Sequence, residues 1–337
     1  MKILLKALQH LKSRAHFYHN VTHCKRRLST CWTLHSLKSR GVVQLRGTDV
    51  KPFLQGLITN DITQLGSECS SMYAMLLNVQ GRVMYDLLLY QKVLDDGNPC
   101  VLLEHDRHVT SDFIKLLKRY KIRKKIDIAD ISDSLHVFAV LPPSGSSDGT
   151  FLSMEQASVY RTDLDPRVSS FGRRILSSNE DDIFKSVHQG SELVVSPEED
   201  YHEARYRQGI SEGIVDLPPG NCFPLESNLV YLNGACFQKG CYIGQELTAR
   251  TFHTGVTRKR LMPLEFDSVP DGLSAGDNIV SQNGKSAGKF RNSAGKYGLG
   301  LVRMAEIKGT MSVKNKDDKS YNVQIKSPSW WPVDEQK

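Results

Sequence analysis

The spacing of apolar residues changes along the chain, and this change constrains the fold most strongly. From residue 41 to about 195, short strand-like runs alternate with single amphipathic helices. After Leu261, short apolar runs are separated by Gly, Asn and Ser at intervals of roughly ten residues. The first pattern is typical of an α+β sheet layer, and the second of a small antiparallel barrel. We therefore expect an α+β fold that ends in a C-terminal antiparallel β-barrel.

A polar stretch rich in Pro, Gly and Ser, residues 142–150, divides the α+β part in two. The pattern predicts a helix after Thr48-Asp49, another at about 109–120, and strands near 41–46, 73–79, 82–91, 100–104, 126–131 and 135–141. We expect four divisions of the chain: residues 1–36, a first α+β domain at 37–145, a second at 146–258, and the barrel at 259–337.

The first forty residues differ in charge from the rest of the chain. They hold nine of the 44 Lys and Arg residues and no Asp or Glu, and Met1–Leu11 has the pattern of an amphipathic helix. This is typical of a mitochondrial presequence, although a disordered basic tail is the alternative. We expect residues 1–36 to be a presequence cleaved between Arg27 and Leu34, which implies the mitochondrial matrix.

The remainder of the chain is not basic. Beyond residue 40 it has 35 Lys and Arg against 37 Asp and Glu, which argues against binding of nucleic acid by charge alone. Residues 118–125 do contain six cations, which we interpret as a solvated helix end or a contact for an acidic partner. No pattern of aromatic residues accompanies them as RNA stacking would require. No apolar run is long enough to span a membrane.

One motif places a single thiol in an unusual setting. Residues 239–250 read Lys-Gly-Cys-Tyr-Ile-Gly-Gln-Glu-Leu-Thr-Ala-Arg, with Cys241 beside Lys239 and between Gly240 and Gly244. A neighbouring cation favours the thiolate, which is both the nucleophile and the metal ligand. A buried, inert cysteine is the alternative. The chain has seven cysteines and no Cys-x-x-Cys pair, so we do not expect a closed zinc site.

This motif resembles the signature of the YgfZ/GcvT folate-binding superfamily, which includes the aminomethyltransferase of glycine cleavage. The resemblance covers about residues 38–325 and extends to residues 53–61, 165–167, 172–173, 203–210 and 224–229. Within the superfamily the chain is most similar to the mitochondrial iron–sulfur cluster assembly factor branch, through residues 77–86, 247–250 and 256–261. The resemblance implies an aminomethyltransferase-like ring of three domains around a central folate-sized cavity.

The resemblance to this branch implies an assembly factor and not an ordinary enzyme. Such a factor acts late in building [4Fe–4S] clusters, with A-type scaffold proteins as partners. A cluster needs about four protein ligands, so one thiol can only complete a [2Fe–2S] or [4Fe–4S] cluster that is shared with a partner. We expect Cys241 to be that shared ligand. The rest of the motif should support it: Lys239 by favouring the thiolate, Gly240 and Gly244 by admitting a partner's backbone, and Tyr242, Gln245, Glu246 and Arg250 by holding the loop.

A tetrahydrofolate-dependent one-carbon transferase is the alternative function. Aminomethyltransferases typically carry paired aspartates after a Gly-Gly turn, whereas here the stretch is Gly81-Arg82 followed by Tyr85-Asp86. Asp86 would then be the acid–base group at the folate nitrogen. The folate itself would be held by Glu226, Asn78 and Arg82. The competing interpretation of Asp86 is a strand residue whose carboxylate is satisfied by backbone amides.

Overall fold

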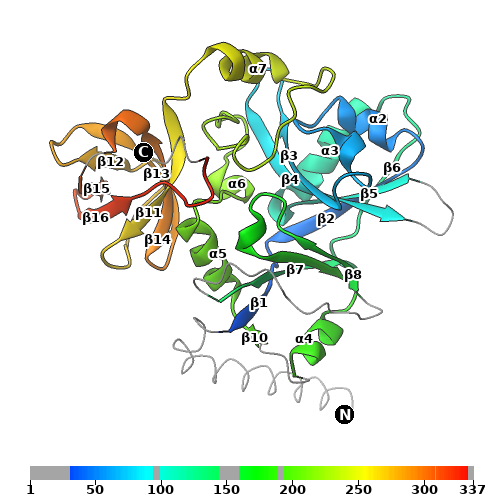
Figure 1. Cartoon of the computed structure of the whole chain (residues 1–337), viewed down its shortest axis with the longest axis horizontal. Coiled ribbons are helices and arrows are strands. Elements are labelled where there is room, and N and C mark those ends of the chain that lie inside the picture. Colours follow the sequence, from blue (N-terminus) through cyan, green and yellow to red (C-terminus); the bar gives the residue numbers. More distant parts are fainter. Residues whose placement is uncertain (1–30, 94–98, 144–158, 189–192, 308, 333–337) are drawn as a thin grey trace.

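The protein is described from a computed structural model, which covers residues 31–93, 99–143, 159–188, 193–307 and 309–332. Its strands form two five-stranded sheets and one closed barrel. Figure 1 shows the barrel at one side of the molecule, the first sheet at the other, and the second sheet below the first. Helices α5 (Glu198–Arg207), α6 (Gly213–Asp216) and α7 (Gln245–Thr254) lie between these bodies. The α+β class and the terminal barrel predicted from the sequence are therefore confirmed.

The first sheet has the strand order β3-β4-β5-β2-β6. Helices α2 (Val50–Gln55) and α3 (Thr110–Lys121) contribute to the core on one of its faces. All pairings in this sheet are antiparallel. Its strands are β2 (Arg40–Arg46), β3 (Ser71–Leu77), β4 (Val83–Val93), β5 (Pro99–Asp106) and β6 (Asp127–Asp130).

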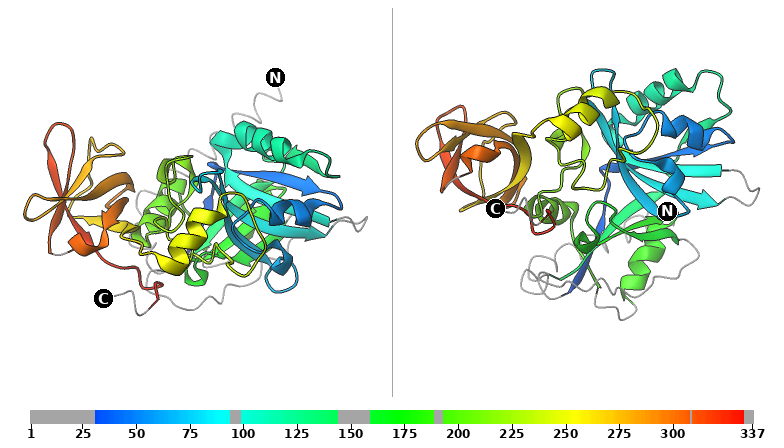
Figure 2. Two further views of the ribbon diagram at one scale, coloured as in Figure 1. Left: turned by 90° about the horizontal axis from the view of Figure 1, so that it is seen from above. Right: turned by 45° about the horizontal axis from the view of Figure 1, so that its top comes forward.

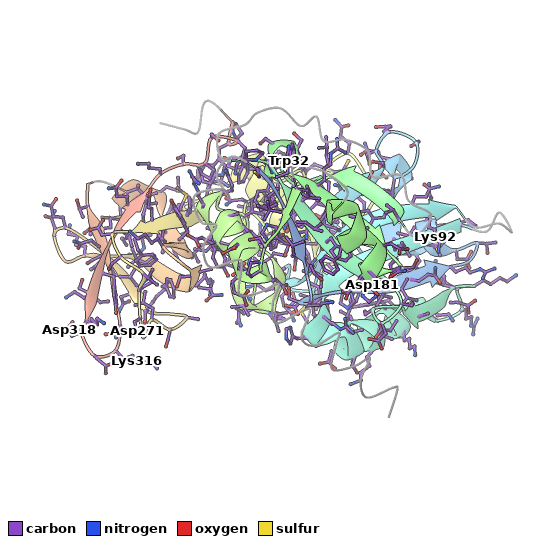
Figure 3. All side chains as sticks on the ribbon, turned by 90° about the horizontal axis from the view of Figure 1, so that it is seen from below. Trp32, Lys92, Asp181, Asp271, Lys316 and Asp318 are labelled. Carbon is purple, nitrogen blue, oxygen red and sulfur yellow. The ribbon has the colours of Figure 1, made fainter. Side chains whose placement is uncertain are left out.

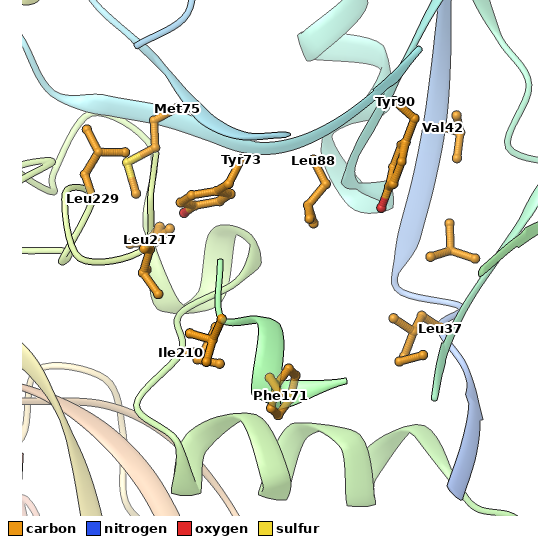
Figure 4. Close-up of a cluster of buried hydrophobic side chains, with 14 of the residues drawn as sticks. Leu37, Val42, Tyr73, Met75, Leu88, Tyr90, Phe171, Ile210, Leu217 and Leu229 are labelled. Atoms are coloured by element: carbon orange, nitrogen blue, oxygen red, sulfur yellow. The ribbon is translucent and has the colours of Figure 1, made fainter. Parts of the chain in front are cut away.

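Strand β3 is buried on both faces, which places the first sheet between two hydrophobic cores. Successive side chains of a strand point to opposite faces. Accordingly Met72, Ala74 and Leu76 join the core with α2 and α3, whereas their neighbours Tyr73, Met75 and Leu77 face the second core. Figure 4 shows Tyr73, Leu88 and Tyr90 pointing from the first sheet toward Phe171, Ile210 and Leu37. This second core joins the first sheet to the centre of the molecule.

The second sheet has the order β10-β1-β7-β9-β8. Strand β1 is parallel to β10 and antiparallel to β7. Helix α4 (Glu180–His188) follows β9 in the chain, and its Ile183 lies in the core of this sheet. The strands are β1 (Trp32–Ser36), β7 (His136–Leu141), β8 (Val159–Leu164), β9 (Arg173–Ser177) and β10 (Leu193–Val195).

The barrel closes in the order β11-β14-β13-β12-β15-β16. Helix α5 packs against β11, β13 and β14 on one side and against β1 on the other, so it couples the barrel to the second sheet. Figure 3 shows Asp271, Lys316 and Asp318 at the outer end of the barrel. Figure 2 shows the barrel and the first sheet at opposite sides of the molecule. The strands are β11 (Lys259–Phe266), β12 (Asn278–Ser281), β13 (Ser286–Ala294), β14 (Tyr297–Arg303), β15 (Met311–Lys314) and β16 (Ser320–Ile325).

Long-range pairing moves two of the expected boundaries. Trp32–Ser36, which we expected to lie in the presequence, forms β1 of the second sheet. The presequence prediction otherwise concerns residues 1–30, outside the described residues. His136–Leu141, expected in the first domain, pairs with β1 and β9 and so belongs to the second sheet. Strand periodicity identifies strands but not their partners, which explains both shifts.

Helix α2 begins at Val50 as predicted, but not for the predicted reason. The side chain of Asp49 makes no capping hydrogen bond. It accepts a hydrogen bond from the backbone N–H of Lys125 at 2.7 Å instead, and thereby joins α2 to the loop after α3. Among the described residues, no helix is long and apolar enough to cross a membrane.

Candidate functional site

The thiol loop, residues 239–244, leads directly into α7 and presents Cys241 to solvent. The residues next to Cys241 are fixed to the protein body. Tyr242 is buried, and the backbone N–H of Ile243 donates to the carbonyl oxygen of Gly56 at 3.1 Å. The alternative of a buried, inert Cys241 is therefore wrong: the thiol is exposed on an anchored backbone.

Gly244 holds the thiol loop against the turn between β3 and β4. Its φ is 77°, and a Cβ atom there would lie 2.2 Å from the carbonyl oxygen of Asn78. Gly81 approaches from the other side, with a φ of 75° and 3.0 Å between its own ideal Cβ and the carbonyl oxygen of Gly244. Only glycine adopts this conformation without strain and admits such close contact. Gly244 therefore serves packing within the chain, whereas Gly240 has no atom within 4 Å of its ideal Cβ and is open to a partner.

Lys239 is turned inward. Its Nζ donates to the carbonyl oxygens of Ile58 and Asn60 at 2.8 and 2.7 Å and lies 5.1 Å from the ring centroid of Tyr242. Burial lowers the pKa of Lys239 to about 8. We expected this cation to favour the Cys241 thiolate, but its ammonium group bonds to backbone carbonyl oxygens instead. Lys239 ties the thiol loop to the segment that follows α2.

The remaining polar residues of the motif divide into one that holds the loop and two that face solvent. The Oε1 of Gln245 accepts a hydrogen bond from the backbone N–H of Tyr242 at 3.2 Å, which orients the loop as expected. Glu246 and Arg250 are exposed on α7. In the part of the chain that the structure describes, the Arg250 side chain makes no hydrogen bond or ion pair, so it does not anchor the loop as we expected.

Exposed apolar side chains surround this region, and the sequence analysis missed them. Phe252 of α7 stacks on Phe237, with ring centroids 3.8 Å apart and an interplanar angle of 4°. Phe252 is 44% exposed, Val256 is 78% exposed, and Val79 in the turn against Gly244 is 71% exposed. Large exposed apolar side chains that gather in one region are typical of interaction surfaces. In the sequence, Phe237 and Phe252 on either side of the motif could have indicated this apolar surface.

Asp86 lies in the interior, away from solvent. It is 3% exposed, its Oδ1 accepts a hydrogen bond from the backbone N–H of Gly213 at 3.0 Å, and its Oδ2 lies 3.7 Å from Nη1 of Arg40. Burial raises the pKa of Asp86, and Arg40 opposes this effect. Arg40 in turn donates from Nε to Glu104 at 2.9 Å.

The same interior contains further buried ion pairs. Arg167 Nη2 lies 2.7 Å from Asp165 Oδ2, and Arg167 Nη1 lies 2.8 Å from Glu212 Oε2. Arg174 also pairs with Glu212. Burial acts to raise the pKa of Glu212, but Arg174, Arg167 and Arg40 outweigh it and hold that pKa well below its usual range. These charges neutralise one another inside the protein, as buried charges must.

This interior does not fit a pterin. A pterin ring needs apolar or aromatic walls and acceptors for its N–H groups. Arginine side chains offer only donors, and the carboxylates beside them are already paired. Tyr73 OH, Asp86 Oδ2 and both Nη atoms of Arg40 lack hydrogen-bond partners among the described residues, but these atoms are grouped around an ion pair. The alternative of tetrahydrofolate chemistry at Asp86 therefore lacks a suitable site.

The residues that we expected to hold folate are divided between two places. The Oδ1 of Asn78 accepts hydrogen bonds from the backbone N–H groups of Gln80 and Arg82, so it closes the turn between β3 and β4. The guanidinium of Arg82 lies 3.5 Å from the ring centroid of Phe223. Burial raises the pKa of the half-buried Glu226 carboxyl, and the charge of Arg82 partly opposes this rise.

Two cavities of the described residues bear on this region. One, of about 310 Å³, lies between α7 and the chain on either side of Glu226, and we call it the α7 cavity. It is lined by Phe223, Pro224, Leu225, Glu226, Leu247, Thr248, Thr251, Val256, Thr257, Arg258 and Lys259. The other, of about 630 Å³, lies between the start of β3 and the end of β8 and includes Cys69 and Tyr73. Asp86 lines neither of them.

The described residues contain no cluster of three or more His, Cys, Asp or Glu that could hold a metal ion. Among these residues, Cys241 therefore has no neighbouring side chains that could bind a metal ion together with it. Any metal centre at this thiol needs ligands from elsewhere.

Comparison with known proteins decides the family. The mitochondrial iron–sulfur cluster assembly factor IBA57 of Mus musculus is 43% identical to this chain over 315 residues, covering 90% of this chain and 86% of the relative. The chain belongs to the IBA57 family of mitochondrial iron–sulfur cluster assembly factors. The IBA57 protein of Homo sapiens is 38% identical over 312 residues, with the same coverage of both chains. The family described as CAF17, C-terminal beta-barrel domain, matches residues 258–333 of this IBA57 family member, which is where the barrel lies.

A solved structure supports the fold. The glycine cleavage system aminomethyltransferase T from Bartonella henselae superimposes with a TM-score of 0.69, covering 92% of this chain and 88% of that one, at 14% sequence identity. The resemblance to the aminomethyltransferase fold is thus confirmed for the architecture. At this identity the similarity concerns the fold alone.

Proposed function

We propose that this protein acts in the mitochondrial matrix, late in the maturation of [4Fe–4S] proteins, with an A-type scaffold protein as partner and Cys241 as a shared cluster ligand. The observation that carries the proposal is the exposed thiol of Cys241 on an anchored loop. It is joined by the family membership, whose curated members are named mitochondrial iron–sulfur cluster assembly factors.

The number of ligands supports a shared cluster. An iron–sulfur cluster is held by about four protein ligands, mostly cysteine thiolates. The described residues offer Cys241 without a neighbouring ligand set. A partner that supplies the remaining thiolates completes the coordination, so the cluster is cargo that passes through the interface and is not a resident cofactor.

The structure of the loop suits this task. Gly244, Lys239 and Gln245 fix the backbone on both sides of Cys241, so little conformational entropy is lost when the thiol binds iron. Gly240 leaves the approach to the thiol open. A thiolate-ligated cluster carries negative charge, and Arg250 is an exposed cation on α7, the helix that follows the thiol loop.

Anaerobic reconstitution tests the proposal. The wild-type chain is mixed with iron, sulfide and an A-type scaffold protein, and absorption and Mössbauer spectra report the cluster. We expect a cluster whose spectrum requires both proteins, and we expect Cys241→Ser to abolish it.

Cys236→Ser is the matched control, because Cys236 precedes the same loop and is less exposed than Cys241. It should retain the shared cluster. A cluster that survives Cys241→Ser unchanged, or one that never depends on the partner, would show that the bridging ligand is assigned incorrectly.

A further inference from the structure

Apolar side chains lie at both ends of the thiol loop. Phe237 precedes Cys241 by four residues, so the chain keeps the two at most about 14 Å apart. Phe252 adjoins the same end of the loop, because its ring stacks on that of Phe237. At the other end, Val79 lies in the turn between β3 and β4 that packs on Gly244. We call Val79, Phe237 and Phe252 the apolar collar.

The apolar collar is exposed and already held in place. Val79 and Phe252 keep 71% and 44% of their surface in contact with solvent. The two phenylalanine rings restrain each other through their stack, and the turn that carries Val79 is fixed by its contact with Gly244. Little conformational entropy is therefore lost when a partner covers these side chains, and the water released from their apolar surface favours that step.

The thiol of Cys241 decides which protein covers the collar. The described residues give Cys241 no neighbouring ligand set, so the other ligands of a cluster at this thiol come from the partner. Those ligands bind the iron atoms of the same cluster, which brings the partner's surface within a few ångströms of Cys241. An interface of ordinary size covers about 800 Å² on each protein, a disc of roughly 16 Å radius. The collar lies within this disc or at its edge.

The collar is too small to hold a partner by itself. Stable complexes bury about 1,200–2,000 Å² in total, which three side chains cannot supply. Contacts to the collar therefore form once the cluster bridges the two proteins. Apolar contacts that surround a central bond add little affinity of their own, but they keep water away from that bond.

We propose that the apolar collar closes on the A-type partner around the bridging cluster and excludes water from it, and that this exclusion sets the lifetime and the reduction potential of the cluster. A cluster becomes more negative when it is reduced, so the removal of water disfavours the reduced state and lowers the potential. Exclusion of water also slows the access of chelators to the iron. Val79, Phe237 and Phe252 are positioning residues, because they shape the surroundings of the cluster and bind no iron. The inference rests on the proposed function for the shared cluster and for the partner.

Cluster loss and reduction potential test this inference. The shared cluster is assembled anaerobically from the A-type scaffold protein and wild-type chain, Phe252→Ser, Phe252→Leu or Val79→Ser. The decay of its absorption after addition of EDTA gives the half-life, and titration with dithionite gives the midpoint potential. We expect both serine variants to form the cluster, to lose it about fivefold faster and to have a higher midpoint potential, because water reaches the cluster. Phe252→Leu keeps an apolar side chain and should stay close to wild type.

Val269→Ser is the matched control. Val269 is 61% exposed and lies two residues before Asp271, which Figure 3 places at the outer end of the barrel, so this variant should lose the cluster at the wild-type rate. Val79→Ser changes an exposed side chain and should keep the melting temperature of the free chain, which excludes misfolding as the cause of its effect. A shared cluster that both serine variants hold with the wild-type half-life and potential overturns this inference alone. A wild-type mixture that forms no shared cluster overturns the cluster proposal and this inference together.

Discussion

Replacement of Gly244 by alanine tests whether the thiol loop depends on close packing within the chain. The backbone of Gly244 has a φ of 77°, which costs an L-residue about 1–2 kcal/mol. The new Cβ would also lie 2.2 Å from the carbonyl oxygen of Asn78, and relief of such an overlap typically costs about 1–3 kcal/mol. Loss of flexibility in the unfolded chain returns about 0.4–1 kcal/mol. We expect Gly244→Ala to lower the free energy of unfolding by about 2–4 kcal/mol.

Gly220 provides a matched control for this prediction. It has the same φ of 77°, but its ideal Cβ has no atom within 4 Å. Gly220→Ala should therefore cost only the conformational part, about 1 kcal/mol. Urea unfolding of both variants, followed by circular dichroism, measures the difference. Equal free energies of unfolding for the two variants would refute the claim that the contact with Asn78 requires glycine.

Three further perturbations follow from the site. Burial lowers the pKa of Lys239 to about 8, so between about pH 8 and pH 10.5 the unfolded chain binds more protons than the folded chain. Stability to urea should therefore rise with pH across this window, and Lys239→Met should remove the rise; equal slopes would contradict this. Arg174→Met leaves Glu212 with fewer buried partners and should cost about 3–5 kcal/mol in urea unfolding, and a loss below about 1 kcal/mol would count against the buried network. Phe252→Ser removes the stacked pair with Phe237 and should cost about 1 kcal/mol; no change in unfolding would show that the stack adds no stability.

Local patterns in the sequence were sufficient to predict these strands and helices and to single out the thiol of Cys241. The strands near 73–79 and 82–91 and the helix near 109–120 follow from period and turn chemistry, and β3, β4 and α3 lie there. Such patterns act over a few residues, which is why they survive in any tertiary context. The glycines on either side of Cys241 likewise indicated an unusual backbone, and Gly244 does adopt a φ of 77°.

The roles of individual polar side chains depended on contacts that no local pattern contains. Lys239 neighbours Cys241 in sequence, yet its ammonium bonds to Ile58 and Asn60. Asp86 resembles a catalytic carboxylate in its motif, yet it sits beside Arg40, which is distant in sequence. A buried charge must be paired or hydrogen-bonded, and the fold decides which group lies close enough to be its partner.

Local periodicity was enough to predict the class of fold, residue identity singled out the thiol of Cys241, and the resemblance of the motifs to a known family indicated the family. Contacts between distant segments were needed to show that Trp32–Ser36 belongs to a sheet, that arginines fill the interior at Asp86, and that Thr248 and Arg258 share a cavity on α7. These features depend on which segments pair and pack, and such choices are made by the burial of the whole chain and not by any single stretch of it.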